Sequence, residues 1–466
     1  MSTDEISTVN DIPESKENNR SFFEFLKDSK LQFSTEAVED FLLSLKAKQF
    51  LILSGGTGTG KTRLAKAYGE YISTFEPKTI DVTVKNGKVD GNNGFTLSRD
   101  KFFSGLPPSA NKLDGEYDFS IGGLPGRGKI AITPRFWFDR NDPNREKIMQ
   151  RLDELKGTND KITLTIKMPS LDPGSMNYLI VPVGSNWTDN RHIIGYRNAI
   201  TSSYSSTPSL DFIIKSNKFI TQPFLLVLDE MNLSHVERYF SDVISCMESG
   251  EDILLDTDNS KNIPESVTLD DNLFIIGTVN MDETTYMFSP KVLDRANVIE
   301  FEPVSISDCL SSDSAANEPT GDIKFLQDCM SGLECRSMSY TDIINEMKSK
   351  GNEEFIKSLV SDLDSIQKFM ISMKLPFGFR TLDEIMRFMY VAWIYEGRGL
   401  FENWKRYFDS QIRQKIIPKI HGNSSISAPL KELKVFCENN GYGKSASKLG
   451  KMEAVLDSQR YVSFNC

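Results

Sequence analysis

The residues from Gly55 to Thr62 have the types and the spacing that bind the phosphates of a nucleotide. Their sequence, GGTGTGKT, fits the P-loop pattern G-x-x-x-x-G-K-[ST]. Glycines let such a loop turn with positive φ and bring its backbone N–H groups against phosphate, where the next helix adds a favourable dipole. The pattern assigns Lys61 to the β- and γ-phosphates and the Thr62 hydroxyl to Mg²⁺. We expect nucleotide contacts from Gly55, Gly56, Thr57, Gly58, Thr59, Gly60, Lys61, Thr62 and Arg63.

The segments on either side of this loop argue against a chance match. The apolar run 50–53 (FLIL) predicts a strand that ends at the loop, and residues 63–68 (RLAKAY) predict a helix that follows it. Strand, loop and helix N-terminus are the context that the pattern requires. The chain is therefore expected to bind a nucleoside triphosphate.

Two further polar groups follow apolar runs later in the chain. Residues 224–228 (FLLVL) form the continuous apolar run of a strand covered on both faces, and Asp229 and Glu230 come at its end. Beside a phosphate-binding loop, Asp229 would hold Mg²⁺, directly or through water, and Glu230 would polarise the attacking water. The apolar run 273–279 ends in Asn280, whose amide could position water near the γ-phosphate, although Asn at a strand end is often only a turn former.

An α/β fold with a parallel sheet would bring these residues together, because α/β folds place ligands at the carboxyl ends of their strands. About a hundred residues separate the first helix from the next core strand, which indicates an inserted β-rich domain with one helix. From residue 323 onward the periodicity is mostly helical. The predicted division is a disordered leader (1–20), N-terminal helices (21–49), an α/β core (50–75 and 177–304), the insert (76–176), a linker (305–322) and a C-terminal helical region (323–466).

Composition limits the classes of function. The net charge of −11 excludes a polycation that coats DNA, so DNA contact would be local. The insert mixes cations with aromatic residues that could stack on bases, although a small core with charged rims explains them slightly better. Scattered cysteines, no secretory leader and no membrane-length apolar run predict a cytoplasmic protein without a membrane partner. The mixed residues are Arg127, Lys129, Arg135, Phe136, Trp137, Phe138 and Arg140.

The order of these motifs resembles an AAA+ NTPase: a P-loop, a strand ending in Asp229-Glu230, a strand ending in Asn280, then Leu293-Asp294-Arg295. Neighbouring segments are similar to the McrB-like branch, which contains the nucleotide-hydrolysing motors of modification-dependent restriction systems. These segments are 183–189 (VGSNWTD), 194–196 (IGY), 229–233 (DEMNL), 236–240 (VERYF) and 277–283 (GTVNMDE). The resemblance covers residues 50–69 and 178–420.

The resemblance implies roles for single residues. Asn280 corresponds to sensor 1, and Arg295 to the arginine finger that acts on the nucleotide of a neighbouring subunit. Arg380, in the helical region, corresponds to sensor 2 and would touch the γ-phosphate from a helical lid. Either arginine could instead be an ordinary surface charge at a helix end. Tyr196 and Arg197 become candidates for a loop in the central pore of a ring.

The resemblance also implies a function. It predicts a hexameric motor that uses GTP or ATP with Mg²⁺, moves DNA through its pore or contacts it through the insert, and serves a partner McrC-like nuclease. GTP-using McrB proteins share M-N-x-x-D after the sensor-1 strand, whereas this chain has VNMDE, so GTP is favoured only slightly over ATP. The alternative is an AAA+ ATPase that remodels protein partners without a DNA role, which the acidic net charge favours mildly.

Overall fold

The computed structural model describes most of the 466-residue chain. The described residues are 20–75, 79–85, 94–96, 115–131, 135–139, 141–154, 161–167, 171, 175–201, 203–255, 263–281, 286, 288–302 and 319–464. Residues 1–19 of the predicted leader, residues 305–318 of the predicted linker, Arg140, and the acidic pair Asp282 and Glu283 lie outside them. Within these ranges no helix is both long enough and apolar enough to cross a bilayer.

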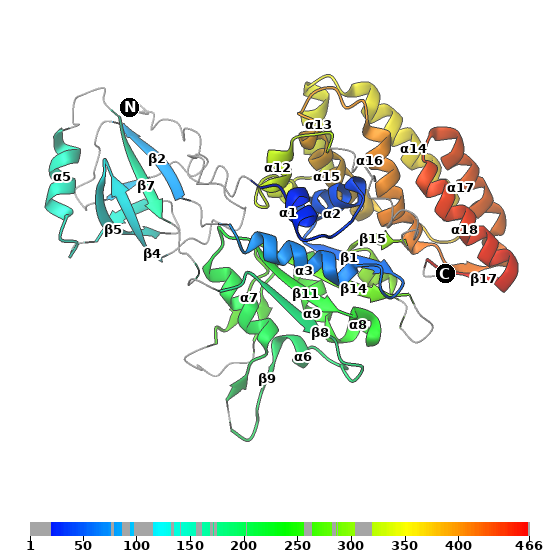
Figure 1. The fold of residues 1–466 in the computed structure, drawn as a ribbon, viewed down its shortest axis with the longest axis horizontal. Coiled ribbons are helices and arrows are strands. Elements are labelled where there is room, and N and C mark those ends of the chain that lie inside the picture. Colours follow the sequence, from blue (N-terminus) through cyan, green and yellow to red (C-terminus); the bar gives the residue numbers. More distant parts are fainter. Residues whose placement is uncertain are drawn as a thin grey trace.

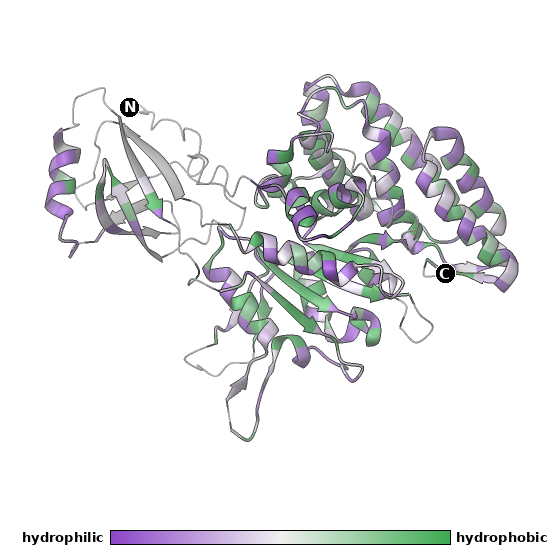
Figure 2. Cartoon of the chain, in the orientation of Figure 1, coloured by the Kyte–Doolittle hydropathy of each residue, from purple (hydrophilic) through white to green (hydrophobic). Residues whose placement is uncertain are grey.

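A five-stranded parallel sheet forms the centre of the fold, with the order β15-β1-β14-β11-β8. The strands are β1 (Phe50–Gly55), β8 (Tyr178–Pro182), β11 (Phe224–Asp229), β14 (Leu273–Asn280) and β15 (Asn297–Phe301). Almost every residue of β1, β11 and β14 is buried, as expected for strands covered on both faces. Figure 2 shows the hydrophobic residues concentrated along these strands. The predicted α/β fold with a parallel sheet is confirmed.

Helices connect the strands of this sheet and cover it (Figure 1). The N-terminal helix α2 (Thr35–Ala47) is capped by Ser34, whose hydroxyl accepts a hydrogen bond from the Ala37 N–H. Ser289 also caps a helix, but its hydroxyl makes no capping hydrogen bond. The other helices of this part are α1 (Phe22–Asp28), α3 (Lys61–Ile72), α6 (Arg191–Ile194), α7 (Pro208–Lys218), α8 (Val236–Tyr239), α9 (Ser241–Ser249) and α10 (Pro290–Leu293).

A six-stranded antiparallel sheet lies between α3 and β8 in the sequence, with the order β2-β7-β4-β5-β6-β3. Its strands are β2 (Thr79–Lys85), β3 (Gly94–Thr96), β4 (Gly115–Ile121), β5 (Leu124–Ala131), β6 (Arg135–Phe138) and β7 (Lys161–Lys167). Among the described residues of this part, the helix α5 (Arg145–Glu154) accompanies them. Figure 1 shows this sheet to one side of the parallel sheet. The chain therefore leaves the core after α3 and returns to it at β8.

The C-terminal region is helical, as predicted, and packs against the core through α2 and β15. Its helices are α12 (Ile323–Gln327), α13 (Tyr340–Ser349), α14 (Glu353–Ser372), α15 (Phe379–Tyr395), α16 (Trp404–Gln411), α17 (Ser427–Asn440) and α18 (Gly443–Gln459). The helix α16 does not continue regularly, because it passes into a π-helical segment, η4 (Ile412–Ile416). Figure 1 shows these helices beside the sheet edge formed by β15.

Candidate functional site

The phosphate-binding loop joins the end of β1 to the start of α3. Gly55, Gly58 and Gly60 adopt φ values of 153°, 83° and 92°, which favour glycine. A Cβ at Gly55 would lie 2.5 Å from the carbonyl oxygen of Phe301, so no larger residue fits there. The loop therefore leaves its backbone open toward the N-terminus of α3, where an anion is favoured.

Lys61 lies at this N-terminus and is only 5% exposed. Its ammonium donates hydrogen bonds to the carbonyl oxygens of Gly55 and Gly56, at 2.8 and 2.6 Å. Burial lowers the pKa of Lys61, and the negative charges of Asp229 and Glu230 oppose that shift. The lysine is thus positioned at the loop, and a phosphate there would replace two neutral acceptors with a charged one.

Thr62 and Asp229 meet where the sequence predicts the metal ligands. The Thr62 hydroxyl donates to one carboxylate oxygen of Asp229 at 2.7 Å. A hydroxyl and a carboxylate at this distance from one another suit Mg²⁺, which usually takes one or two protein ligands and completes its shell with phosphate and water. Among the described residues, no group of three or more histidine, cysteine or acidic side chains could hold a metal ion, so the phosphates would have to complete such a site.

Thr278 is the residue of this site that sequence reasoning missed. Its hydroxyl donates to the same Asp229 oxygen at 2.6 Å and accepts a hydrogen bond from the Glu230 N–H at 2.9 Å. It therefore fixes the carboxylate of one residue and the backbone of the next. The available signal was a lone hydroxyl in an apolar strand, two residues before Asn280 and hence on the same face of β14.

Glu230 and Asn280 also lie together. The Asn280 amide donates to a carboxylate oxygen of Glu230 at 3.0 Å. Glu230 adopts a left-handed conformation with φ 54°, an uncommon backbone state for a residue with a side chain and one that often marks functional sites. The side chain of Asn232, fully buried, donates to the Asn280 carbonyl oxygen at 2.9 Å. A carboxylate and an amide are therefore paired at the carboxyl edge of the sheet.

The remaining loop residues line the mouth of the site. Thr57, Gly58 and Arg63 are exposed, whereas the Thr59 hydroxyl donates to the Gly56 carbonyl oxygen at 2.9 Å. The register of the sheet pairs Gly55 with Asn280. The structure therefore brings the whole loop, Asp229, Glu230 and Asn280 to one edge of the sheet.

Arg295 and Arg380 lie elsewhere. Both guanidinium groups form ion pairs with the carboxylate of Glu248, at the end of α9. Arg295 precedes β15, whose first residue, Asn297, pairs with Leu51 near the start of β1. Along these strands Asn297 lies four residues, or about 13 Å, before the pair of Gly55 and Phe301. The Arg380 guanidinium thus pairs with Glu248 in this structure, and its expected contact with the γ-phosphate stays a prediction.

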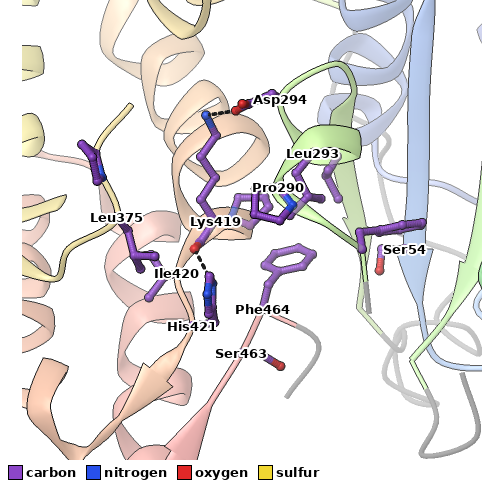
Figure 3. Close-up of a pocket in the computed structure, with 14 residues that line it drawn as sticks. Ser54, Pro290, Leu293, Asp294, Leu375, Lys419, Ile420, His421, Ser463 and Phe464 are labelled. Atoms are coloured by element: carbon purple, nitrogen blue, oxygen red, sulfur yellow. Dashed lines mark hydrogen bonds and ion pairs between the residues drawn. The ribbon is translucent and has the colours of Figure 1, made fainter. Parts of the chain in front are cut away.

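Buried charges fix the segment that carries Arg295. The ammonium of Lys415, on η4, pairs with Glu384 and donates to the carbonyl oxygens of Asp294 and Ala296, at 3.2 and 2.8 Å. Lys419 pairs with the Asp294 carboxylate at 2.5 Å. Figure 3 shows this pair above a cavity of about 190 Å³, with Pro290 and Leu293 of α10 facing the C-terminal region. The helical region thus holds the residues on both sides of Arg295.

A larger cavity of about 960 Å³ adjoins the phosphate-binding loop. Its wall includes Thr59 of the loop, Phe33 before α2, the β15 edge and residues of α16 and α18. Volumes of this order hold small ligands, and a nucleoside attached to phosphates in the loop would extend into it. Several wall charges are already paired, including Arg406 with Glu39 and Lys448 with Glu300, the latter at 2.5 Å.

The predicted pore residues lie on a hairpin. β9 (Tyr196–Arg197) pairs with β10 (Tyr204–Ser205), and Figure 1 shows the hairpin extending from the core on the side away from the helical region. Tyr196 is 46% exposed and Ile200, near the tip, is 94% exposed. In the insert, Arg127 pairs with Asp118 at 3.3 Å, and the side chains of the other predicted nucleic-acid residues are outside the described ones.

Comparison with known proteins assigns part of the helical region. Residues 331–461 match a domain of unknown function (DUF8727). No curated protein matches the chain. The matched segment contains Arg380, α15 and η4, and it does not include the phosphate-binding loop or the strands of the parallel sheet.

Proposed function

We propose that this chain is a Mg²⁺-dependent nucleoside-triphosphatase with an AAA+ core and a helical lid. The observation that carries the proposal is the meeting of Thr62, Asp229 and Thr278 beside the glycine-rich loop, next to the pair of Glu230 and Asn280. The loop and Lys61 bind the phosphates, and Thr62 and Asp229 hold the metal. When bound, Mg²⁺ neutralises charge on the transferred phosphoryl group.

Glu230 and Asn280 act on the attacking water. The carboxylate of Glu230 accepts a proton from the water as it approaches the γ-phosphate, and the Asn280 amide keeps that carboxylate in place at 3.0 Å. Thr278 holds the backbone that presents Glu230. The nucleoside occupies the cavity of about 960 Å³ between the sheet and the helical region. GTP is favoured slightly over ATP by resemblance to the McrB-like branch.

We propose that the protein works as a hexameric ring that moves DNA for a McrC-like nuclease. The resemblance of Arg295 to an arginine finger supports this assembly, because such a residue acts on the nucleotide of a neighbouring copy. The hairpin of β9 and β10 would face the pore, with Tyr196 and Arg197 in contact with the translocated polymer.

A protein-remodelling ATPase is the second candidate. The exposed apolar side chain of Ile200 at the hairpin tip favours it, because an unfolded polypeptide offers apolar contacts that a DNA backbone does not. DNA binding that weakens steeply with salt would favour the DNA motor, and binding of unfolded polypeptide alone would favour the remodeller.

The proposal is tested with the Glu230→Gln variant, which keeps the size of the side chain and removes its negative charge. The variant should bind triphosphate, assemble with it into oligomers whose mass is measured by light scattering, and fail to hydrolyse it. The wild type should assemble and hydrolyse. A wild type that neither assembles with triphosphate nor turns it over would contradict the proposal.

A further inference from the structure

The cavity of about 190 Å³ lies where the parallel sheet meets the helical region (Figure 3). Ser54 of β1, Leu293 of α10 and Val298 of β15 belong to its wall on the side of the sheet. Residues 418–421 and Phe464 belong to its wall on the side of the helical region. An engineered cavity of about 150 Å³ lined by apolar side chains is large enough to bind benzene. The cavity at this junction therefore has room for a molecule of one or two small rings.

Flat side chains make up much of its wall. Aromatic and proline rings present planar surfaces, and aromatic ligands stack on such surfaces or meet them edge to face. These side chains are Phe288, Pro290, Pro376, Pro418, His421 and Phe464. A planar aromatic body suits this wall.

The charged side chains of the wall are paired with each other. The Lys419 ammonium lies 2.5 Å from a carboxylate oxygen of Asp294 and donates to the Thr381 hydroxyl at 2.8 Å. A charged ligand would have to break this pair or stay buried without a counter-ion, and burying an unpaired charge is costly. The cavity therefore favours an uncharged ligand.

Two polar side chains of the wall keep hydrogen-bonding capacity. Ser54 is 1% exposed, and its hydroxyl has no hydrogen-bond partner among the described residues, so no bond fixes its direction. The Nδ1 of His421 lies 2.9 Å from the Lys419 carbonyl oxygen. Because a carbonyl oxygen only accepts, Nδ1 donates this bond, and Nε2 of the uncharged ring is left as an acceptor. A ligand with an N–H or O–H group would satisfy a buried group that otherwise costs stability.

The same wall also borders the larger cavity beside the phosphate-binding loop. Val298 and Phe464 line both the cavity of about 190 Å³ and the cavity of about 960 Å³. The ammonium of Lys448, in the wall of the larger cavity, lies 4.8 Å from the centre of the Phe464 ring. A ligand in the small cavity would therefore contact side chains that also border the proposed nucleoside pocket.

We propose that the cavity of about 190 Å³ binds a small uncharged aromatic molecule with one N–H or O–H group, and that its occupation strengthens triphosphate binding. The second part rests on the proposed function. A ligand that touches both the sheet and the helical region stabilises their packing against each other, and the larger cavity also has walls from both. Two ligands that favour the same arrangement strengthen each other's binding by the same factor.

Indole, phenol and benzene are the probes for the site. Calorimetric titration of the full chain should show one site, with indole and phenol bound several-fold more tightly than benzene, because benzene offers no hydrogen bond. Indole at about ten times its dissociation constant should raise the midpoint of thermal unfolding by about 2 °C. Binding of none of the three would overturn the inference and show a cavity that holds only water. Benzene bound as tightly as indole would overturn the need for the N–H or O–H group.

Variants of the wall locate the site. Leu375→Trp places an indole ring of the chain itself at the cavity and should abolish binding of added indole. The matched control is Leu400→Trp, at a leucine that is 66% exposed, and it should leave binding unchanged. Ser54→Ala should weaken indole binding several-fold without lowering the unfolding temperature of the free protein, because the hydroxyl has no partner there. Indole binding unaffected by Leu375→Trp and by Ser54→Ala would overturn the assignment of this cavity.

The coupling to the nucleotide is measured in the Glu230→Gln variant, which should bind triphosphate without consuming it. Saturating indole should lower the dissociation constant of GTP several-fold, and saturating GTP should lower that of indole by the same factor. An unchanged or weakened GTP affinity would overturn the coupling. A chain that binds indole but no triphosphate would overturn the proposed function and the coupling, and the aromatic site would still stand.

Discussion

At the scale of single residues, the chemistry depends on how Asp229 and Glu230 are held. Thr278 bonds to both, through one hydroxyl that donates at 2.6 Å and accepts at 2.9 Å. The positions of Asp229 and Glu230 therefore depend on Thr278 as well as on their own strand. The neighbouring strand sets the position of the carboxylate and of the backbone.

Replacing Thr278 with valine keeps the shape of the side chain and removes both hydrogen bonds. We expect kcat to fall about 10- to 100-fold and the Mg²⁺ concentration for half-maximal rate to rise, as for other residues that orient metal ligands. Steady-state hydrolysis at a series of Mg²⁺ concentrations measures both effects. Thr278→Ser keeps the hydroxyl and should stay within a few-fold of the wild type; equal losses in the two variants would show that packing, not hydrogen bonding, matters there.

Removal of the metal is the second prediction at this scale. Excess EDTA should abolish hydrolysis, because without the metal beside Thr62 and Asp229 the negative charge of the phosphates is not offset there. Added Mg²⁺ should restore hydrolysis. Thr62→Ala should need more Mg²⁺ for the same rate. Turnover that continues in EDTA would contradict the assignment of these two residues.

The candidate site could be predicted only in part from the sequence. Asp229, Glu230 and Asn280 each follow an apolar run, and the carboxyl ends of parallel strands meet at one edge, so their proximity follows from pattern. The convergence of Arg380 and Arg295 on Glu248 could not be predicted, because the contact joins residues 132 positions apart and depends on how the helical region docks. The roles of all these residues stay predictions.

At the scale of elements, the apolar runs of β1, β11 and β14 made the parallel sheet predictable. The π-helical segment η4 was not, because an extra residue in one helical turn leaves hydrophobic periodicity almost unchanged over so short a span. This segment presents Lys415 to the carbonyl oxygens on both sides of Arg295. The junction between α15, η4 and β15 therefore joins the helical region to the core.

We expect Lys415→Met to lower the free energy of unfolding by about 3–5 kcal/mol, the usual effect of removing one partner of a buried ion pair. Thermal unfolding measures the change, and Lys431→Met, at a half-exposed lysine on α17, is the control that should shift little. Adding Glu384→Gln to Lys415→Met should cost less than the two single changes together. An unchanged unfolding temperature in Lys415→Met would contradict this account of the junction.

At the scale of the whole molecule, the candidate functional groups lie on different elements. The phosphate-binding loop lies at the carboxyl edge of the sheet, Arg295 and Arg380 pair with Glu248 of α9, and the hairpin of β9 and β10 extends from the core (Figure 1). In the proposed ring, the hairpins would gather at the centre. Shape alone does not choose between DNA and polypeptide as the translocated polymer.

Substitutions in the hairpin distinguish DNA from polypeptide as the bound polymer. In a DNA motor, Arg197→Ala should weaken DNA binding and reduce its dependence on salt, whereas Ile200→Ser should have little effect. In a protein remodeller, Ile200→Ser should weaken binding of unfolded polypeptide instead. Fluorescence anisotropy with labelled single-stranded DNA, double-stranded DNA and an unfolded polypeptide measures each case. Binding unaffected by either change would contradict a role for the hairpin in polymer contact.

The central claim is that the edge formed by the loop, Asp229 and Glu230 hydrolyses a nucleoside triphosphate. The most direct measurement is phosphate release from GTP and from ATP by the purified chain with Mg²⁺, compared with Lys61→Ala and Glu230→Gln. We predict turnover by the wild type, slightly in favour of GTP, loss of binding in the lysine variant, and binding without turnover in the glutamate variant. Equal rates in all three proteins, or no binding of either nucleotide by the wild type, would contradict the claim.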